Sequence, residues 1–171
     1  MRVVGTPLPG AYVIEPEPNE DERGLFVRLL DHDEFAKHGL IVPSTQWSVS
    51  FNRKGGTIRG MHYQASPHDE VKLVRCTAGA IFDVIVDLRS ARWFGIELSA
   101  SNRRSLYVPA GMAHGFQSLT DDAEVFYAIE GMYVPDAASG VRWDDAAFGI
   151  EWPLPPTIIS ERDRSFPPFT S

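Results

Sequence analysis

The sequence predicts an all-β fold in which short antiparallel strands build a sandwich or a barrel. Ten short segments rich in β-branched and aromatic residues recur along the chain, and glycine or proline separates them. Many of them alternate with a period of two. Within residues 80–88, Phe82, Val84 and Val86 fall on one face and Ile85 falls on the other. A chain of 171 residues, 43% of them hydrophobic, is large enough for one domain over 1–171 with its own core.

The individual elements follow from the same signals. Strands are expected, in chain order, at residues 11–14, 24–30, 45–51, 57–64, 71–76, 80–88, 94–99, 105–109, 115–119 and 124–129. Turns are expected where proline and glycine gather between them, as in "RKGG" and "VPAGMAHG". Only residues 33–39 are predicted to be helical, because acidic residues begin this segment and Gly39 is placed to end it.

The charge balance and the single cysteine narrow the classes of function. A net charge of −7 and an isoelectric point near 5.2 argue against nucleic acid or an anionic membrane as the main partner. Because Cys76 is the only cysteine, we expect neither an internal disulfide nor a thiolate zinc site. The opening "MRVVGTPLPG" lacks the apolar stretch of a signal peptide, and no later run approaches a membrane span. We therefore expect a soluble cytoplasmic protein.

Residues 109–116, "PAGMAHGF", contain the spacing Pro-x-Gly-x-x-His, which is the second signature of cupin barrels. A metal-binding cupin also needs an earlier cluster with two histidines one residue apart. That stretch reads "HYQ" here, so only His62 is present, and His68 lies in a polar loop. His62 and His114 alone fall short of the three protein ligands usual in a catalytic metal site. The sequence therefore predicts no bound metal.

His62 is then either a base or a polar residue in the barrel wall. A strand histidine taken alone is more often structural, but Gly60 predicts a bulge that would turn both Arg59 and His62 into one cavity. Lys72 shares its strand face with apolar residues, where an amine is seldom found without a reason. Tyr127 lies between apolar residues on its own face, and its simplest interpretation is a wall residue whose hydroxyl is bonded.

Seven blocks, in order along nearly the whole chain, resemble the dTDP-4-dehydrorhamnose 3,5-epimerase family. They are "DERGLF" (21–26), "IRGMHYQ" (58–64), "KLVRC" and "AIFDVIVDLR" (within 72–89), "NRRSLYVPAGMAHGF" (102–116), "FGIEWP" (148–153) and "ISERDR" (159–164). The resemblance implies a cupin-type jelly-roll barrel of antiparallel strands with one or two short helices. It also implies an enzyme without metal or cofactor, which acts on nucleotide-linked 4-keto-6-deoxy sugars. The family precedent further implies a homodimer in which an N-terminal strand pairs with the partner.

The same resemblance implies roles for individual residues. His62 matches the family's base and Asp163 the carboxylate paired with it. Lys72 matches the lysine beside the sugar carbonyl, and Tyr127 matches the proton donor. Substrate contacts are implied for Arg23, Phe26, Gln46, Arg59, His114, Tyr133 and Arg162.

Apart from the resemblance, these side-chain types are suited to the chemistry of epimerisation beside a ketone. Protons at C3 and C5 flank the C4 ketone, so the removal of either creates an enolate. A histidine oriented by a carboxylate is a suitable base near neutral pH, and an ammonium group at the carbonyl oxygen stabilises the developing charge. A tyrosine on the opposite face can return the proton with inversion, and arginines can grip phosphates through forked hydrogen bonds.

The sequence departs from the family pattern at three positions outside the proposed acid–base set. Arg28 and Ala138 stand where members commonly carry an acid, and Ser48 stands where an asparagine is usual. The residues are compatible with epimerisation at C3, at C5 or at both, and they favour thymidine as the nucleoside only through the family precedent. Two alternatives stay open at this point: a metal-dependent cupin enzyme, and a non-catalytic module that binds a sugar nucleotide.

Overall fold

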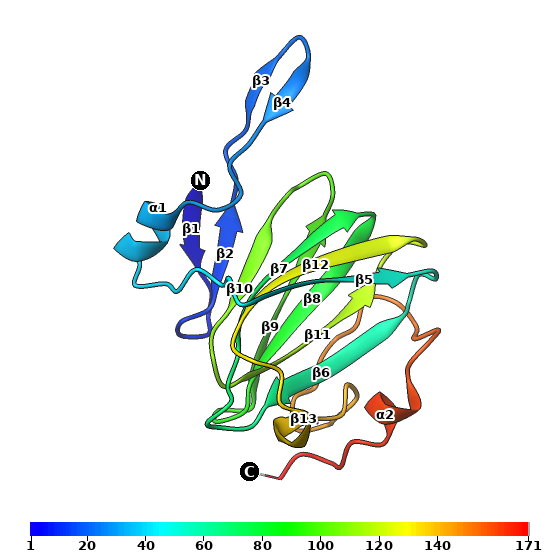
Figure 1. Cartoon of the computed structure of the whole chain (residues 1–171). Coiled ribbons are helices and arrows are strands. Elements are labelled where there is room, and N and C mark those ends of the chain that lie inside the picture. Colours follow the sequence, from blue (N-terminus) through cyan, green and yellow to red (C-terminus); the bar gives the residue numbers. More distant parts are fainter. Residues whose placement is uncertain (171) are drawn as a thin grey trace.

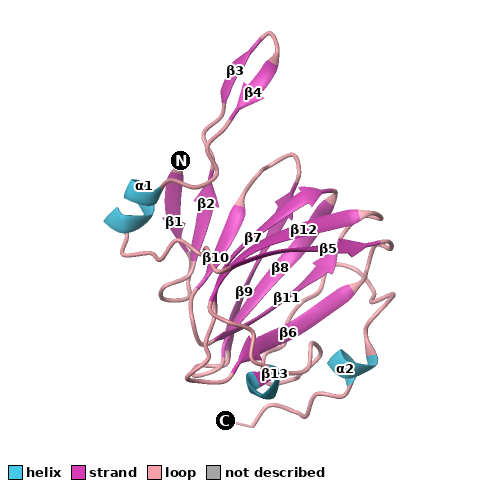
Figure 2. Cartoon of the chain, viewed as in Figure 1, coloured by secondary structure: helices cyan, strands magenta, loops and turns pink. Residues whose placement is uncertain are grey.

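Two antiparallel β-sheets face each other and form a barrel, from which one hairpin projects (Figures 1 and 2). This is a computed structural model, and it describes residues 1–170. The first sheet has six strands in the order β1-β2-β10-β7-β12-β5. They are β1 (Arg2–Gly5), β2 (Tyr12–Glu15), β10 (Ser105–Val108), β7 (Val71–Ala78), β12 (Ala123–Glu130) and β5 (Gln46–Asn52).

The second sheet has five strands in the order β13-β6-β11-β8-β9. They are β13 (Ala138–Gly140), β6 (Ile58–Gln64), β11 (Met112–Ser118), β8 (Ala80–Asp87) and β9 (Arg92–Ser99). The strand pairs within both sheets are antiparallel, which confirms the predicted all-β class. No helix within residues 1–170 is both long and apolar enough to cross a membrane.

Strand β8 shows how the period-two pattern builds the core. Ile81 and Ile85 point between the two sheets and are fully buried there. Val84 and Val86 point to the other face, where the segment after β13 covers them with Phe148. Since both faces of β8 are covered, its sequence is apolar almost throughout. Each such side chain contributes about 1.5–3 kcal/mol through its removal from water.

Residues 24–30 were predicted as one strand, and this prediction is wrong in its length. Only Gly24–Phe26 is a strand, β4, and it pairs with β3 (Asn19–Asp21) in the projecting hairpin. The chain then leaves the extended hairpin so that Leu30 packs against the outer face of the six-stranded sheet. The first part of this apolar run thus lies in the hairpin, and its last part packs against the sheet.

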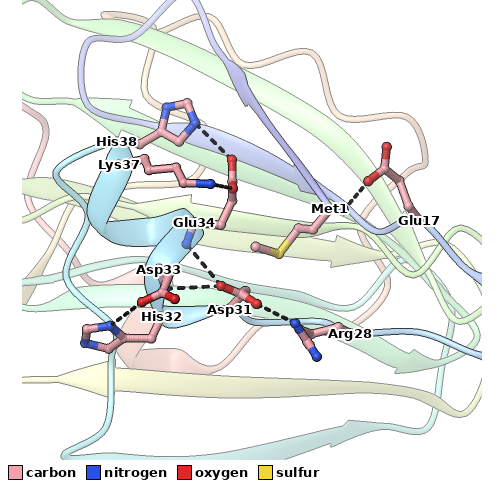
Figure 3. Close-up of polar contacts among 9 residues, drawn as sticks. All are labelled: Met1, Glu17, Arg28, Asp31, His32, Asp33, Glu34, Lys37 and His38. Atoms are coloured by element: carbon pink, nitrogen blue, oxygen red, sulfur yellow. Dashed lines mark hydrogen bonds and ion pairs between the residues drawn. The ribbon is translucent and has the colours of Figure 1, made fainter.

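The helix predicted at 33–39 is present as α1 (His32–Lys37). Asp31 caps it, because its carboxylate accepts hydrogen bonds from the backbone N–H groups of Asp33 and Glu34 (Figure 3). Arg28 donates to the same carboxylate at 2.6 Å. The unusual arginine at position 28 is thus part of a local ion pair beside the helix start. The structure adds a 3-10 turn, η1 (Pro135–Ala137), and a second helix, α2 (Glu161–Arg164).

Candidate active site

A cavity of about 330 Å³ opens between the two sheets. Its lining comes from β5, β7 and β12 of the first sheet and from β6 and β11 of the second, so side chains on opposite walls face one another. The lining residues are Ser48, Val49, Ser50, Arg59, His62, Lys72, His114, Phe116, Tyr127 and Ile129. Five residues predicted from the sequence for catalysis or substrate contact therefore meet in one place, namely Arg59, His62, Lys72, His114 and Tyr127.

A bulge in β6 turns Arg59 and His62 into this cavity, as the sequence predicted. His62 pairs with His114 and Arg59 pairs with Phe116, so β6 contributes one residue more than β11 between these two pairs. Gly60 lies inside the bulge with a φ of 134°, and a Cβ there would lie 2.5 Å from the Cα of Gly115. Only glycine fits such a close approach of two backbones.

The predicted hydrogen bond between His62 and Asp163 is present across 101 residues of sequence. Nε2 of His62 lies 2.8 Å from Oδ1 of Asp163, and the backbone N–H of Gly60 donates to Oδ2 at 3.0 Å. Burial alone would raise the pKa of Asp163, but the hydrogen bonds from His62 and Gly60 outweigh it and leave the pKa below its ordinary value. An ionised carboxylate only accepts, so Nε2 of a neutral His62 carries the proton and Nδ1 keeps its lone pair.

Helix α2 lies beside β6 (Figure 1), and its residue Asp163 meets His62 there. The Ser160 side chain caps this short helix by accepting from the backbone N–H of Asp163 at 3.1 Å. Phe166, just beyond the helix, meets the His62 ring nearly edge-on with ring centres 6.0 Å apart. The base candidate is thus held from two directions.

A second histidine–aspartate pair lies deeper in the barrel. Nε2 of His114 lies 2.8 Å from Oδ1 of Asp83, and both side chains are buried. Oδ2 of Asp83 has no hydrogen-bond partner among residues 1–170. The ring of His114 meets that of Tyr127 nearly edge-on at 6.2 Å and so helps to fix the tyrosine.

Tyr127 reaches the cavity from β12, and its hydroxyl lies 3.2 Å from Oγ of Ser50. Burial raises the pKa of the Tyr127 hydroxyl well above its ordinary value, and the hydrogen bond from Ser50 offsets only part of this effect. The phenol is therefore protonated at neutral pH. A protonated phenol in this position is able to donate a proton to a bound molecule.

Lys72 lies on the same sheet as Tyr127, but its surroundings are less apolar than the sequence suggested. Its strand neighbours Val74 and Cys76 are fully buried, as expected. Its ammonium group, however, pairs with Glu70 at 3.2 Å, and both side chains are nearly buried. Glu70 lies two residues before Lys72 and just outside β7, so extending the period-two pattern by one residue beyond the strand would have placed its carboxylate on the side of the amine.

Of the predicted substrate contacts Arg59, Gln46 and Tyr133, only Arg59 lines this cavity. Arg59 donates to Oδ1 of Asn52 at 2.7 Å and to the carbonyl of Phe51 at 3.2 Å. Gln46 shares a β5 face with Ser48 and Ser50 but is not part of the lining, and it donates to the carbonyl of Gly131 at 3.0 Å. Tyr133 is 55% exposed in the loop after β12.

Arg162 lines a second cavity of about 330 Å³ beside the His62–Asp163 pair. Arg59, His62 and Asp163 line it as well, so the two cavities share Arg59 and His62. The guanidinium of Arg162 lies 5.9 Å from the ring centre of Phe166. Two arginines therefore flank one opening.

Arg23 and Phe26 do not reach either cavity within one chain. Both lie on the projecting hairpin, where Arg23 pairs with Asp21 at 2.6 Å and Phe26 is 71% exposed (Figure 1). Their substrate role stays a prediction.

Sequence reasoning missed Ser50 and Asp83 as parts of the site. The only signal for Ser50 is the alternation of serine with Val49 and Phe51 along β5, and that for Asp83 is a carboxylate in the middle of an apolar strand. Within residues 1–170 no three His, Cys, Asp or Glu side chains are placed to hold a metal ion.

Comparison with known proteins places this geometry in a family. A family model described as dTDP-4-dehydrorhamnose 3,5-epimerase matches residues 5–171. A relative of that name from Methanothermobacter thermautotrophicus is 42% identical, over 98% of this chain and 94% of its own length.

Two solved structures are also similar. The dTDP-4-dehydrorhamnose 3,5-epimerase of Elizabethkingia anophelis is 37% identical with a TM-score of 0.94, over 99% of this chain and 96% of that one. A Legionella pneumophila epimerase in complex with dTDP-4-keto-L-rhamnose is 32% identical with a TM-score of 0.89, over 96% of this chain and 90% of that one. The predictions of a cupin-type jelly roll and of a sugar-nucleotide epimerase, an isomerase, are thereby confirmed. The chain belongs to the dTDP-4-dehydrorhamnose 3,5-epimerase family.

Proposed function

We propose that this protein epimerises a dTDP-linked 4-keto-6-deoxy sugar by moving protons at the carbons beside the C4 ketone, in deoxysugar biosynthesis. The observation that carries the proposal is the opposition of two groups across one cavity. His62, oriented by an ionised Asp163, lies on the five-stranded sheet, and the protonated Tyr127 lies on the six-stranded sheet. A base and an acid on opposite walls are what inversion at a single carbon requires.

The proposed reaction has two proton transfers. His62 takes the proton from C3 or C5, and the electron pair of that C–H bond moves into an enolate. The ammonium of Lys72 stabilises the negative oxygen, which is worth about 10²–10³ in rate for a single well-placed donor. Tyr127 then returns a proton to the opposite face of the carbon and the ketone is restored. The ketone itself makes these protons acidic, so we expect no cofactor.

The substrate follows from the relatives and from the charge around the cavities. A solved relative carries dTDP-4-keto-L-rhamnose, and we propose the same nucleotide class here. Arg59 and Arg162, which flank one opening, suit the diphosphate. We assign the remaining contacts to His114 in the cavity wall and to Gln46 and Tyr133, which lie outside its lining.

We propose that the protein works as a homodimer in which the projecting hairpin reaches the partner. Leu25 and Phe26 on the hairpin are exposed, and so are Trp47, Val49 and Phe51 along β5, the edge strand of its sheet. An apolar edge of this kind is covered in a stable protein. This arrangement would carry Arg23 and Phe26 to a partner's cavity. The cytoplasmic location and the single domain over 1–171 stay predictions.

Proton NMR in D₂O with dTDP-4-dehydro-6-deoxyglucose tests the reaction. We expect loss of the C3 signal, the C5 signal or both, together with the appearance of the epimer. The rate should be unchanged after treatment with a chelator, which separates this enzyme from a metal-dependent one. If the sugar nucleotide binds but no proton exchanges, the protein is a binding module and the proposal is wrong.

A further inference from the structure

The Tyr127 hydroxyl has one side-chain hydrogen-bond partner among residues 1–170, and that partner is Ser50 at 3.2 Å. The strand register alone would not select it. Tyr127 is directly opposite Ser48, whereas Ser50 is opposite Val125, so the hydroxyl leans diagonally along β5. Ser48 also lines the cavity but makes no hydrogen bond to Tyr127. The ring of His114 packs nearly perpendicular to the ring of Tyr127, and Ser50 contacts the tyrosine oxygen.

The proposed reaction requires that the Tyr127 oxygen carry a negative charge for a time. When Tyr127 gives up its proton, a phenolate remains in a largely buried position, and burial disfavours that charge strongly. Arg59 acts in the favourable direction from the same cavity, but no Arg59 nitrogen hydrogen-bonds the tyrosine oxygen. A serine hydroxyl can accept from a phenol and, after rotation, donate to a phenolate.

We infer that Ser50 is a positioning residue for proton return by Tyr127: it aligns the neutral hydroxyl and then stabilises the phenolate. The inference rests on the proposed function and adds one residue to it. In the step itself the O–H bond of Tyr127 breaks and a C–H bond forms with the electron pair of the enolate. The O–H electron pair stays on the tyrosine oxygen. Ser50 keeps its own proton throughout, and solvent later restores the proton of Tyr127.

The test separates exchange from inversion on one sample. Deuterium uptake beside the ketone reports proton removal by His62, and epimer formation reports proton return by Tyr127. In Ser50→Ala we expect inversion to fall about 10- to 100-fold, the usual worth of a hydrogen bond to a charged group. Exchange should change by less than about threefold, since the base and Lys72 are untouched. The ratio of inversion to exchange is therefore the diagnostic quantity.

Two substitutions with side chains of equal shape distinguish the loss of the hydroxyl from a loss of structure. Ser50→Thr and Ser50→Val both place a β-branched residue on β5, which strands accept readily, and they differ only in the hydroxyl. We expect Ser50→Thr to restore most of the inversion and Ser50→Val to behave like Ser50→Ala. Ser48→Ala is the matched control, and its ratio of inversion to exchange should equal that of the unmodified protein.

The double variant decides whether Ser50 acts through Tyr127. Tyr127→Phe should separate exchange from inversion, and adding Ser50→Ala to it should change the ratio no further. A Ser50→Ala ratio equal to that of the unmodified protein, or a further loss in the double variant, would overturn the role of Ser50. If the unmodified protein exchanges no protons, the proposed function fails first and this inference falls with it.

Discussion

Replacement of Asp163 by asparagine tests the link between the C-terminal helix and the proposed base. In the structure the aspartate is almost fully buried and accepts two hydrogen bonds, from His62 at 2.8 Å and from the backbone of Gly60 at 3.0 Å. An asparagine at this position would have nearly the same volume but no charge. The variant therefore removes the electrostatic component of the pair and leaves the packing in place.

The magnitude follows from the kind of contact that is lost. A hydrogen bond to a charged group contributes about 1.5–3 kcal/mol, which corresponds to roughly 10- to 150-fold in rate. The loss acts on proton removal, because the positive charge that forms on His62 no longer has an anion beside it. An asparagine can also present its amide N–H to Nε2 and favour the wrong tautomer, which makes the lower figure a minimum.

The assay is deuterium exchange at C3 and C5, followed by proton NMR, with calorimetric titration of dTDP on the same preparation. We expect slower exchange and an unchanged affinity for dTDP. Glu161→Gln, on the exposed side of the same short helix, removes an equal charge without touching His62 and is the matched control. Exchange at the normal rate in Asp163→Asn would refute the pairing of base and carboxylate as a catalytic unit.

Three further outcomes are expected. Lys72→Met should slow exchange by about 10²–10³, measured by the same NMR assay, because no other ammonium lines the cavity in the described residues. Gly60→Ala should lower the free energy of unfolding in urea by about 2 kcal/mol or more, since its Cβ would lie 2.5 Å from the backbone of Gly115. Asp87→Asn should lower the melting temperature at neutral pH. Although burial raises the pKa of Asp87, hydrogen bonds, chiefly from Arg89, leave it below its ordinary value. Its contribution is thus present above about pH 3.9 and lost as the pH falls through the lower folded pKa, so the difference in melting temperature should shrink on acidification.

A strand was predictable from the sequence where its whole apolar segment lies in one structural environment. Residues 80–88 alternate with a period of two, and apolar residues of other segments pack against both faces of this strand. Residues 24–30 carry an equally apolar run, but the strand that pairs with its first part reads "NED", which has no β-type composition. Local propensity therefore gave no sign that the run would divide between a hairpin and a packed loop.

The site was predictable only in part, because its contacts join distant segments. The bulge at Gly60 has a local cause and could be predicted from it. Asp163 lies 101 residues from His62, and only the family resemblance linked the two. Ser50 was missed because its partner Tyr127 depends on strand register, which no short window of sequence contains. Glu70 was missed because it lies just before the predicted strand, although it is only two residues from Lys72.

The residues that the structure describes include two histidine–aspartate pairs, and their exposure rather than their geometry distinguishes the roles that we propose for them. His62 and His114 are directly opposite in the β6–β11 register, and each has Nε2 2.8 Å from an aspartate oxygen. The side chain of His62 is 38% exposed, whereas that of His114 is 5% exposed over a fully buried Asp83. A base must reach the carbon of a bound sugar and afterwards release its proton to solvent, and only His62 has that access. His114 instead braces the ring of Tyr127 from the side. We therefore propose that the deeper pair holds the acid in place and that the outer pair removes the proton.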